Sequence, residues 1–158
     1  MTDESTWLTP AAHAKLSEEL EELKTEGRRQ MEIRLAEARS HGDLRENGDY
    51  DAAKNDQGLM EARIRQVESI LATAEVQEAV DDGTVGIGSV VTVVDDDGDE
   101  MEYFVAIPEN KVPGYLLASP GSPVGQALIG ARQGDTVECD APAGMYSLTI
   151  TSVRPFRT

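Results

Sequence analysis

The feature that most constrains the fold of this chain is a heptad repeat over residues 50–74. Apolar side chains there follow the alternating three- and four-residue spacing of a coiled-coil seam, and a single glutamine interrupts them. The seam positions are Tyr50, Ala53, Gln57, Met60, Ile64, Val67, Leu71 and Ala74. So narrow an apolar stripe needs a second long helix to cover it. The pattern therefore predicts a helix that packs along a partner of similar length.

The segment before it supplies that partner. It begins at Thr9, a good N-cap, and Pro10, a favoured first helical residue, and runs to about Ser40. Its apolar line is Leu16, Leu20, Leu23, Met31, Leu35 and Ala38, and the spacing slips near Gly27, where we expect the seam to unwind locally. About 31 residues at 1.5 Å rise give an arm of roughly 46 Å. Since neither arm has apolar surface for another neighbour, we predict an antiparallel coiled-coil hairpin within residues 1–82.

Nine residues of unusual composition join the two arms, and residues 41–49 read HGDLRENGD. Asp43 and Glu46 are placed at the distal turn of the hairpin. One interpretation is a capping box for the second helix, with Gly42 ending the first. The other is that the turn presents two carboxylates to a cation. On periodicity alone the cap is favoured, because helix caps are far commoner than metal-binding arms.

Beyond a short acidic break at Asp81–Thr84 the apolar period changes to two, which is typical of strands. The expected strands are residues 89–94, 102–107, 136–139 and 146–153, with a short one at 116–117. The first two are joined by a turn, Asp95–Asp99, and Ser122–Gly130 has the N-cap, proline and closing glycine of a short helix. We therefore predict an α+β chain: a helical hairpin (1–82) and a small antiparallel β-sheet domain with one helix (83–158).

The net charge of −16 narrows the class of partner. It argues against direct binding to duplex DNA, because phosphate neutralisation needs clustered Lys and Arg. A basic protein surface or a bound cation is the better electrostatic match. The lone Cys139 cannot form an internal disulfide, the sequence MTDESTWL lacks the pattern of a signal peptide, and no apolar run approaches membrane length. These features predict a soluble, cytoplasmic protein that does not bind membranes.

Other candidate sites are weaker. The run Asp95–Asp99 resembles half of a calcium-binding loop, but the twelfth position is Ala106 rather than glutamate, so a solvated turn is expected. His13 and His41 are roughly 42 Å apart along a helix, too far to share a metal. Both histidines fall in the hairpin, so no serine of the sheet domain has a partner for nucleophilic hydrolysis.

Two separated motifs carry a resemblance to a known family. Gly42–Asn47 reads Gly-Asp-Leu-Arg-Glu-Asn, and the sheet domain contains Ser122-Pro123 followed by Leu128-Ile129-Gly130. In this order, and over nearly the whole chain, the sequence closely resembles the Gre family of bacterial transcript cleavage and elongation factors. The resemblance implies an FK506-binding-protein-like fold for the C-terminal domain.

The resemblance also implies a mechanism. Gre factors bind RNA polymerase, insert the coiled coil into its secondary channel and stimulate the polymerase's own cleavage of backtracked RNA, so the factor itself is not an enzyme. Asp43 and Glu46 would hold a Mg²⁺ ion jointly with the polymerase. Arg45, Asn47 and Lys54 would lie near the nascent RNA 3′ end. The residues expected to bind the polymerase are Ser119, Pro120, Ser122, Pro123, Leu128, Ile129 and Gly130.

Three points stay open at this level. Asp49 and Asp51 add two acids beside the tip, and mutual repulsion would raise the proton affinity of the four carboxylates. Lys54, Arg63 and Arg65 fit ion pairs on a coiled-coil surface at least as well as contacts with RNA. Two alternatives to a cleavage factor are a polymerase inhibitor that occupies the channel, and a prolyl isomerase or chaperone, which would need an aromatic-lined pocket.

Overall fold

The structure, a computed structural model, describes residues 5–40 and 48–157. The chain divides into two compact units. One holds His13–Ala74 together with the residues before Trp7, and the other holds Trp7–Ala12 and the chain from Glu75 onward. The domain boundary predicted between residues 82 and 83 lies further along the chain than this division.

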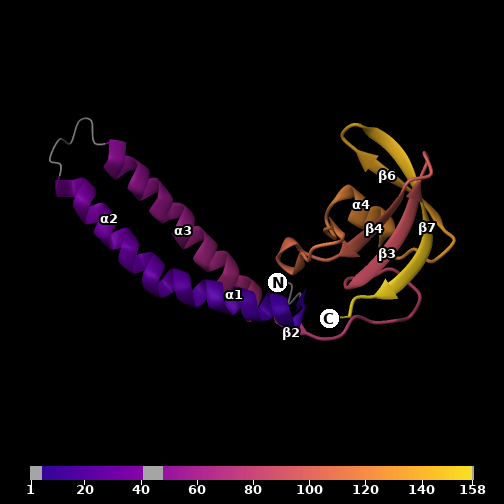
Figure 1. The fold of residues 1–158 in the computed structure, drawn as a ribbon, viewed down its shortest axis with the longest axis horizontal. Coiled ribbons are helices and arrows are strands. Elements are labelled where there is room, and N and C mark those ends of the chain that lie inside the picture. The colour runs from indigo at the N-terminus through magenta and orange to yellow at the C-terminus, as the bar shows by residue number, and fades with distance from the viewer. Residues whose placement is uncertain (1–4, 41–47, 158) are drawn as a thin grey trace. The chain divides into compact units, whose positions relative to one another are not determined.

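The first unit is the predicted helical hairpin. Helix α1 (Pro10–Glu22) continues through a π-helical turn, η1 (Leu23–Gly27), into α2 (Arg28–Ser40). Helix α3 (Gly48–Ala72) returns antiparallel along this arm (Figure 1). The seam positions Ala53, Ile64 and Val67 are buried, as is Ala38 on the opposite arm. The heptad pattern therefore predicted both the element type and the packed face.

The π-helical turn lies where the first arm's apolar spacing slips. A π-helical turn contains more residues than an α-helical one, so it accommodates the point at which the apolar spacing departs from the heptad. The residue at the end of this turn has little room, because a Cβ on Gly27 would lie 3.3 Å from Met60 Sδ. Thr25 Oγ1 also donates a hydrogen bond to the Glu21 carbonyl (2.7 Å). The predicted local unwinding near Gly27 is confirmed, as a π-helical turn.

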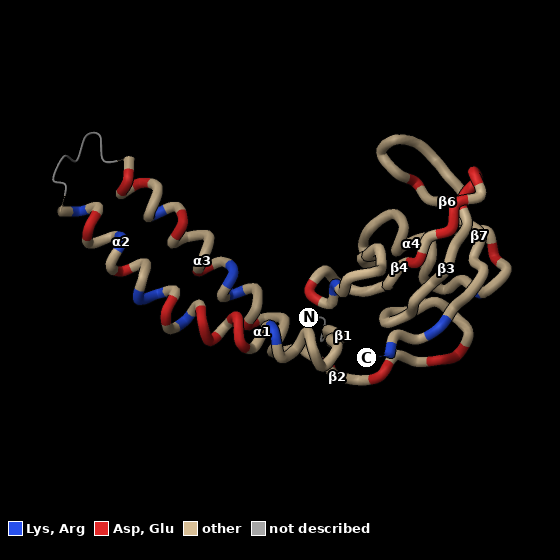
Figure 2. The backbone as a smooth tube through the Cα atoms, viewed as in Figure 1, with Lys and Arg blue, Asp and Glu red and all other residues tan. Residues whose placement is uncertain are grey.

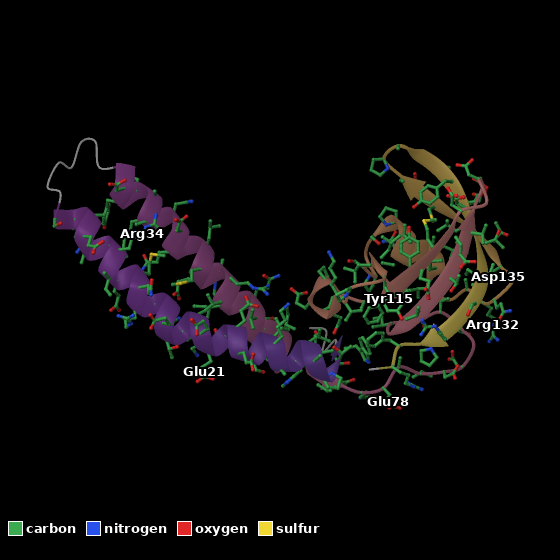
Figure 3. The ribbon with its side chains drawn as sticks, viewed as in Figure 1. Glu21, Arg34, Glu78, Tyr115, Arg132 and Asp135 are labelled. Atoms are coloured by element: carbon green, nitrogen blue, oxygen red, sulfur yellow. The ribbon has the colours of Figure 1, made fainter. Side chains whose placement is uncertain are left out.

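Charged side chains flank the seam. In the described part of the hairpin four ion pairs join the two arms: Glu19–Arg63 (2.6 Å), Lys24–Glu68 (3.3 Å), Arg28–Glu61 (2.9 Å) and Arg34–Asp56 (2.7 Å). Figure 2 shows the two signs of charge mixed along both arms, and Arg34 is labelled in Figure 3. Arg63 therefore has the ion-pair role that was one of its two interpretations.

Two short strands at the base of α1 and α3 were not foreseen. Strands β1 (Thr6–Leu8) and β2 (Ala74–Val76) form a two-stranded sheet. Thr9 then caps α1 as predicted, because its Oγ1 accepts a hydrogen bond from the Ala12 N–H (3.0 Å). The buried Asn110 fixes this segment: its Oδ1 accepts from the Thr9 N–H and its Nδ2 donates to the Trp7 carbonyl, both at 2.9 Å. Residues 7–12 consequently group with the β domain.

The β domain is built on a five-stranded sheet with the order β5-β4-β3-β7-β6. Its strands are β3 (Ser89–Asp95), β4 (Glu100–Val105), β5 (Leu116–Ala118), β6 (Thr136–Ala141) and β7 (Gly144–Pro155). Short helices are η2 (Pro108–Asn110) and α4 (Pro123–Leu128), and α4 packs against β6. The pairings β3–β4, β3–β7 and β6–β7 are antiparallel, as predicted, whereas the short edge strand β5 pairs with β4 in parallel.

The two faces of this sheet bury different side chains. One face, with Val91 and Val93 of β3, packs with Leu128 of α4 in an aliphatic cluster. The other face, with Val90 and Phe104, is covered by aromatic rings. Phe104 is stacked on Phe156 (4.6 Å between ring centroids) and meets Trp7 and Tyr115 edge-on, at 5.9 Å and 6.4 Å. Successive residues of β3 therefore point to opposite faces of the sheet and pack in two separate layers of side chains.

Candidate functional site

The hairpin tip lies between the end of α2 at Ser40 and the start of α3 at Gly48. The predicted tip residues Gly42, Asp43, Arg45, Glu46 and Asn47, and with them the capping-box interpretation, lie outside the described residues. The described structure does show what brings the chain to this point. Seven residues, 41–47, separate the ends of the two antiparallel arms in sequence, and the motif Gly-Asp-Leu-Arg-Glu-Asn falls wholly in that connection.

A polar pair joins the arms directly below the tip. Arg39 Nη2 of α2 donates a hydrogen bond to the hydroxyl of Tyr50 on α3 (3.3 Å), and its guanidinium carbon lies 5.6 Å from the centre of the Tyr50 ring. This contact raises the pKa of Arg39 and lowers the pKa of Tyr50. Sequence reasoning assigned Tyr50 to the seam and gave Arg39 no role. Because the pair crosses between helices, no spacing along the chain could have revealed it.

The predicted RNA-proximal Lys54 lies one turn further down α3. Its Nζ donates a hydrogen bond to Gln57 Oε1 (3.1 Å), a neighbour on the same helix. Arg63, in contrast, is held by both oxygens of Glu19 on the first arm. Of the two, Lys54 therefore keeps a side chain that can turn toward another molecule without breaking a contact between the arms.

The predicted polymerase-binding residues lie in one segment, residues 119–130, which we call the docking segment. It leaves β5 and contains α4. Ser122 caps the helix: its Oγ accepts a hydrogen bond from the Gly125 N–H (3.1 Å) and donates one to the Ser119 carbonyl (2.7 Å). Pro123 is the first helical residue, as the sequence pattern indicated.

A close backbone contact gives the docking segment its shape. Gly125 is buried, and a Cβ added to it would lie 1.9 Å from the Ser119 carbonyl oxygen. No side chain fits there without moving the backbone. At the C-terminal end of the segment Gly130 has a φ of +91° and donates its N–H to the Val85 carbonyl (2.9 Å). The segment is thus held in its middle and at its end by glycines in positions that other residues fill poorly.

The seven docking residues differ in what they expose. Pro123, Ile129 and Gly130 are exposed, and Ile129 leaves 40% of its surface open, much for an isoleucine. Three others are half-buried: Ser119, Pro120 and the N-cap residue Ser122. Leu128 is fully buried in the aliphatic cluster, so it offers no surface to a partner. Its contribution is to hold α4 on the sheet and so to present Ile129.

The acidic run Asp95–Asp99 forms the turn between β3 and β4. Oδ1 of Asp95 accepts hydrogen bonds from the N–H groups of Asp97 and Asp99, both at 2.9 Å, and Gly98 has a φ of +85°. Carboxylate oxygens of Asp95, Asp97 and Asp99 lie within 4.8 Å of one another. The local geometry is that of the hairpin turn expected from the sequence.

Comparison with known proteins identifies the family to which this chain belongs. Residues 6–76 match the family model for the N-terminal domain of the transcription elongation factors GreA and GreB, and residues 80–155 match the model for their C-terminal domain. The chain belongs to the GreA/GreB family of transcription elongation factors. The family resemblance and the fold class predicted from the sequence are both confirmed. Gre-type organisation, a helical hairpin followed by a β domain, is also what the structure shows.

Individual GreA proteins match along nearly their full length. Transcription elongation factor GreA of Saccharopolyspora erythraea is 43% identical over 155 residues, covering 96% of this chain and 95% of the relative. That of Acetivibrio thermocellus is 41% identical over 156 residues, covering 97% and 98%. Among solved structures, GreA factor homolog 1 of Thermus thermophilus aligns at 29% identity over 96% of this chain and 99% of its own, with a TM-score of 0.45. Within the described residues of this Gre factor no helix could span a membrane.

Proposed function

We propose that this Gre factor binds RNA polymerase and stimulates the polymerase's own cleavage of backtracked RNA, so that arrested transcription can resume. The observation that carries the proposal is the place of the motif Gly42–Asn47, which connects two long antiparallel arms at their far end. Membership of a family of elongation factors supports it. The factor is not itself an enzyme, since it completes an active centre that belongs to the polymerase.

The tip carboxylates are the chemical part of the proposal. Asp43 and Glu46 supply hard oxygen donors, which suit Mg²⁺, and they would hold that ion jointly with the polymerase. When bound, such an ion supplies charge stabilisation for phosphodiester hydrolysis. Asn47 is a neutral donor and acceptor beside them, and Arg45 and Lys54 offer positive charge to the RNA 3′ end. The factor alone, with two carboxylates at a connection between helices, is not expected to retain the ion.

The arms serve this chemistry by fixing its distance. An α-helix rises 1.5 Å per residue, so an arm the length of α3 spans roughly 37 Å. The ion pairs between the arms and the Arg39–Tyr50 contact keep the two helices in register up to the last turn before the tip. Carboxylates carried on such a rod arrive at a set depth in the polymerase channel, and this is the positioning that catalysis by a shared ion requires.

The docking segment supplies the remaining binding surface. Exposed Pro123, Ile129 and Gly130 form its outward part, and Ser122 and Gly125 hold the backbone beneath them. An apolar residue left open on a rigid turn can anchor another protein, because its burial on binding costs little conformational entropy. We therefore assign binding to the β domain and chemistry to the hairpin tip.

A charge-removal experiment tests the tip. Asp43→Asn, Glu46→Gln and the double variant should lose stimulated RNA cleavage in a stalled, backtracked elongation complex. The affinity for RNA polymerase should stay within about twofold, because the docking segment of the β domain is unchanged. Raising the Mg²⁺ concentration should partly restore the single variants. Glu37→Gln, which removes one exposed charge from the same arm, is the matched control and should cleave normally.

Two outcomes would count against the proposal. Full cleavage by the double variant would exclude joint coordination of the ion by Asp43 and Glu46. A wild-type protein that binds polymerase and slows elongation without any cleavage would instead identify a channel-occupying inhibitor. The neighbouring acids Asp49 and Asp51, in the first turn of α3, would then be the first residues to replace by their amides.

A further inference from the structure

An open hollow of about 330 Å³ lies beside the docking segment, and nothing in the motifs pointed to it. One wall is formed by α4 and by Gly121, the residue before its N-cap. The other wall is the edge strand β6, which packs against α4. The residues that line it are Gly121, Pro123, Gln126, Ala127, Glu138 and Asp140. Four of the lining residues also belong to the docking segment: Gly121, Pro123, Gln126 and Ala127. A partner seated on that segment therefore also reaches the hollow.

The charges around this hollow are all of one sign. The docking segment, SPGSPVGQALIG, contains no charged residue. Glu138 and Asp140 occupy alternate positions of β6, lie on the same side of the strand and are exposed. Within the described part of the chain neither carboxylate has an ion-pair partner. Figure 2 shows the same contrast, a tan tube along α4 and red on β6. The hollow thus combines a neutral wall with an acidic one.

We propose that this hollow receives a basic side chain, lysine or arginine, from the surface of RNA polymerase, and that Glu138 and Asp140 determine the charge that the docking partner must carry. The inference rests on the proposed function. A volume of this size accommodates a guanidinium or ammonium group with its aliphatic stem lying along Pro123 and Ala127. Charge complementarity beside an apolar anchor gives orientation and a faster encounter, in addition to affinity. Docking would therefore weaken as salt is added.

The test compares the whole factor with its Glu138→Gln/Asp140→Asn variant. Binding to core RNA polymerase is measured by fluorescence anisotropy across a salt series. We expect the variant to bind about tenfold more weakly at low salt, since each exposed ion pair contributes a factor of a few, and to show a shallower salt dependence. In cleavage assays the half-maximal factor concentration should rise by the same factor, while the maximal rate is unchanged, because the tip is intact.

The control removes two charges elsewhere in the β domain. Asp81→Asn/Glu100→Gln replaces two exposed acids outside the hollow, and it should leave both affinity and salt dependence as in the wild type. If the two double variants behaved alike, the effect would be one of net charge, and the hollow would not be a subsite. If both variants bound with wild-type affinity and cleavage stayed normal, the proposed function would stand and this inference would fall.

One further outcome distinguishes a different occupant. A second copy of this chain could also seat a basic side chain in the hollow, and sedimentation velocity of the factor alone would detect it. We expect the sedimentation coefficient to be unaffected by Glu138→Gln/Asp140→Asn. A shift in self-association without a change in polymerase affinity would assign the hollow to contacts between copies and would overturn the proposal.

Discussion

Gly125 shows how one missing side chain shapes a binding surface. Its backbone passes so close to Ser119 that the carbonyl of Ser119 occupies the space a Cβ would need. That carbonyl also accepts hydrogen bonds from the Ser122 hydroxyl (2.7 Å) and backbone N–H (2.9 Å). The turn before α4 is therefore tied together around a single oxygen atom. Contacts inside the turn therefore hold the exposed Pro123 in a defined position.

We accordingly expect Gly125→Ala to be costly. Forcing a methyl group against backbone in a packed turn should destabilise the β domain by about 3 kcal/mol and weaken polymerase binding. Unfolding in urea can be followed by the fluorescence of Trp7, the single tryptophan, whose ring contacts Phe104. Gly121→Ala, at a glycine with open space and no positive φ, is the matched control for stability and should leave the free energy of unfolding nearly unchanged. Equal stability of the two variants would contradict this account of the turn.

At the scale of elements, the hairpin combines a thin seam with ion pairs at its edges. Ala38 and Ala53 bury little apolar area, and four ion pairs between the arms flank the seam in the described part of the hairpin. Two of these carboxyls respond to their partners. The hydrogen bond from Arg63 holds the pKa of Glu19 below its usual value, and the hydrogen bond from Arg28 does the same for the pKa of Glu61.

These shifts give the hairpin a predictable response to acid. A carboxyl whose pKa is lower in the folded than in the unfolded state contributes stability above its unfolded value of 4.5, and this contribution is lost as the pH falls through the lowered folded value. We expect the thermal midpoint of the helical signal at 222 nm to fall as the pH is lowered from 6 to 3. The fall should be smaller in Glu19→Gln/Glu61→Gln.

A control separates this effect from the protonation of other acids. Glu32→Gln removes an exposed carboxyl of α2 that forms no ion pair in the described structure. The thermal midpoint of this variant should therefore fall with pH as much as that of the wild type. If Glu19→Gln/Glu61→Gln lost as much stability between pH 6 and 3 as the wild type, the ion pairs between the arms would not be the groups responsible.

Long periodic elements were the ones that the sequence pattern predicted well. The heptads of residues 50–74 located α3, and the break in spacing at Gly27 located the π-helical turn. Strands β3, β6 and β7 were placed within a few residues because each alternates over several positions. Strands β1 and β2 span three residues each, too few to show a period, and they were not predicted. The short strand expected at 116–117 is β5, but its parallel pairing with β4 depends on the sheet as a whole.

The candidate sites divide along the same line. Asp43 and Glu46 stand in a contiguous motif, so the sequence alone picked them out, and Ser122 and Pro123 were found through cap chemistry. Arg39–Tyr50 joins two helices, and Glu138 with Asp140 meets α4 only in the folded domain. Such pairs depend on tertiary packing. Leu128 shows the converse: a residue within a recognisable motif proved to be core.

On the scale of the whole molecule, the hairpin's length becomes a functional quantity. Deleting residues 28–34 and 56–62 removes one heptad from each arm, shortening it by roughly 10 Å at 1.5 Å per residue. The ion pairs Glu19–Arg63 and Lys24–Glu68 are retained. We expect this variant to bind polymerase, keep its helical signal and lose stimulated cleavage, because the tip then stops short by several metal–ligand distances of about 2 Å.

The same design contains its control. Deleting residues 28–34 alone leaves the arms unequal, so that variant should lose helical signal as well as cleavage. Excess of the evenly shortened protein should also compete with the wild type and reduce its cleavage. If the evenly shortened protein cleaved at the full rate, the arm would not set the depth of the carboxylates, and they would act by some route other than direct coordination.

The amide of Asn110 has a consequence for the order in which the chain folds. Asn110 is separated in sequence from its hydrogen-bond partners Thr9 and Trp7 by 101 and 103 positions, respectively. Both partners leave the ribosome long before Asn110 does. The hairpin can close through nearer contacts, and contacts of low sequence separation form faster. We therefore expect residues 7–9, although synthesised early, to dock on Asn110 only after the segment around Asn110 has folded.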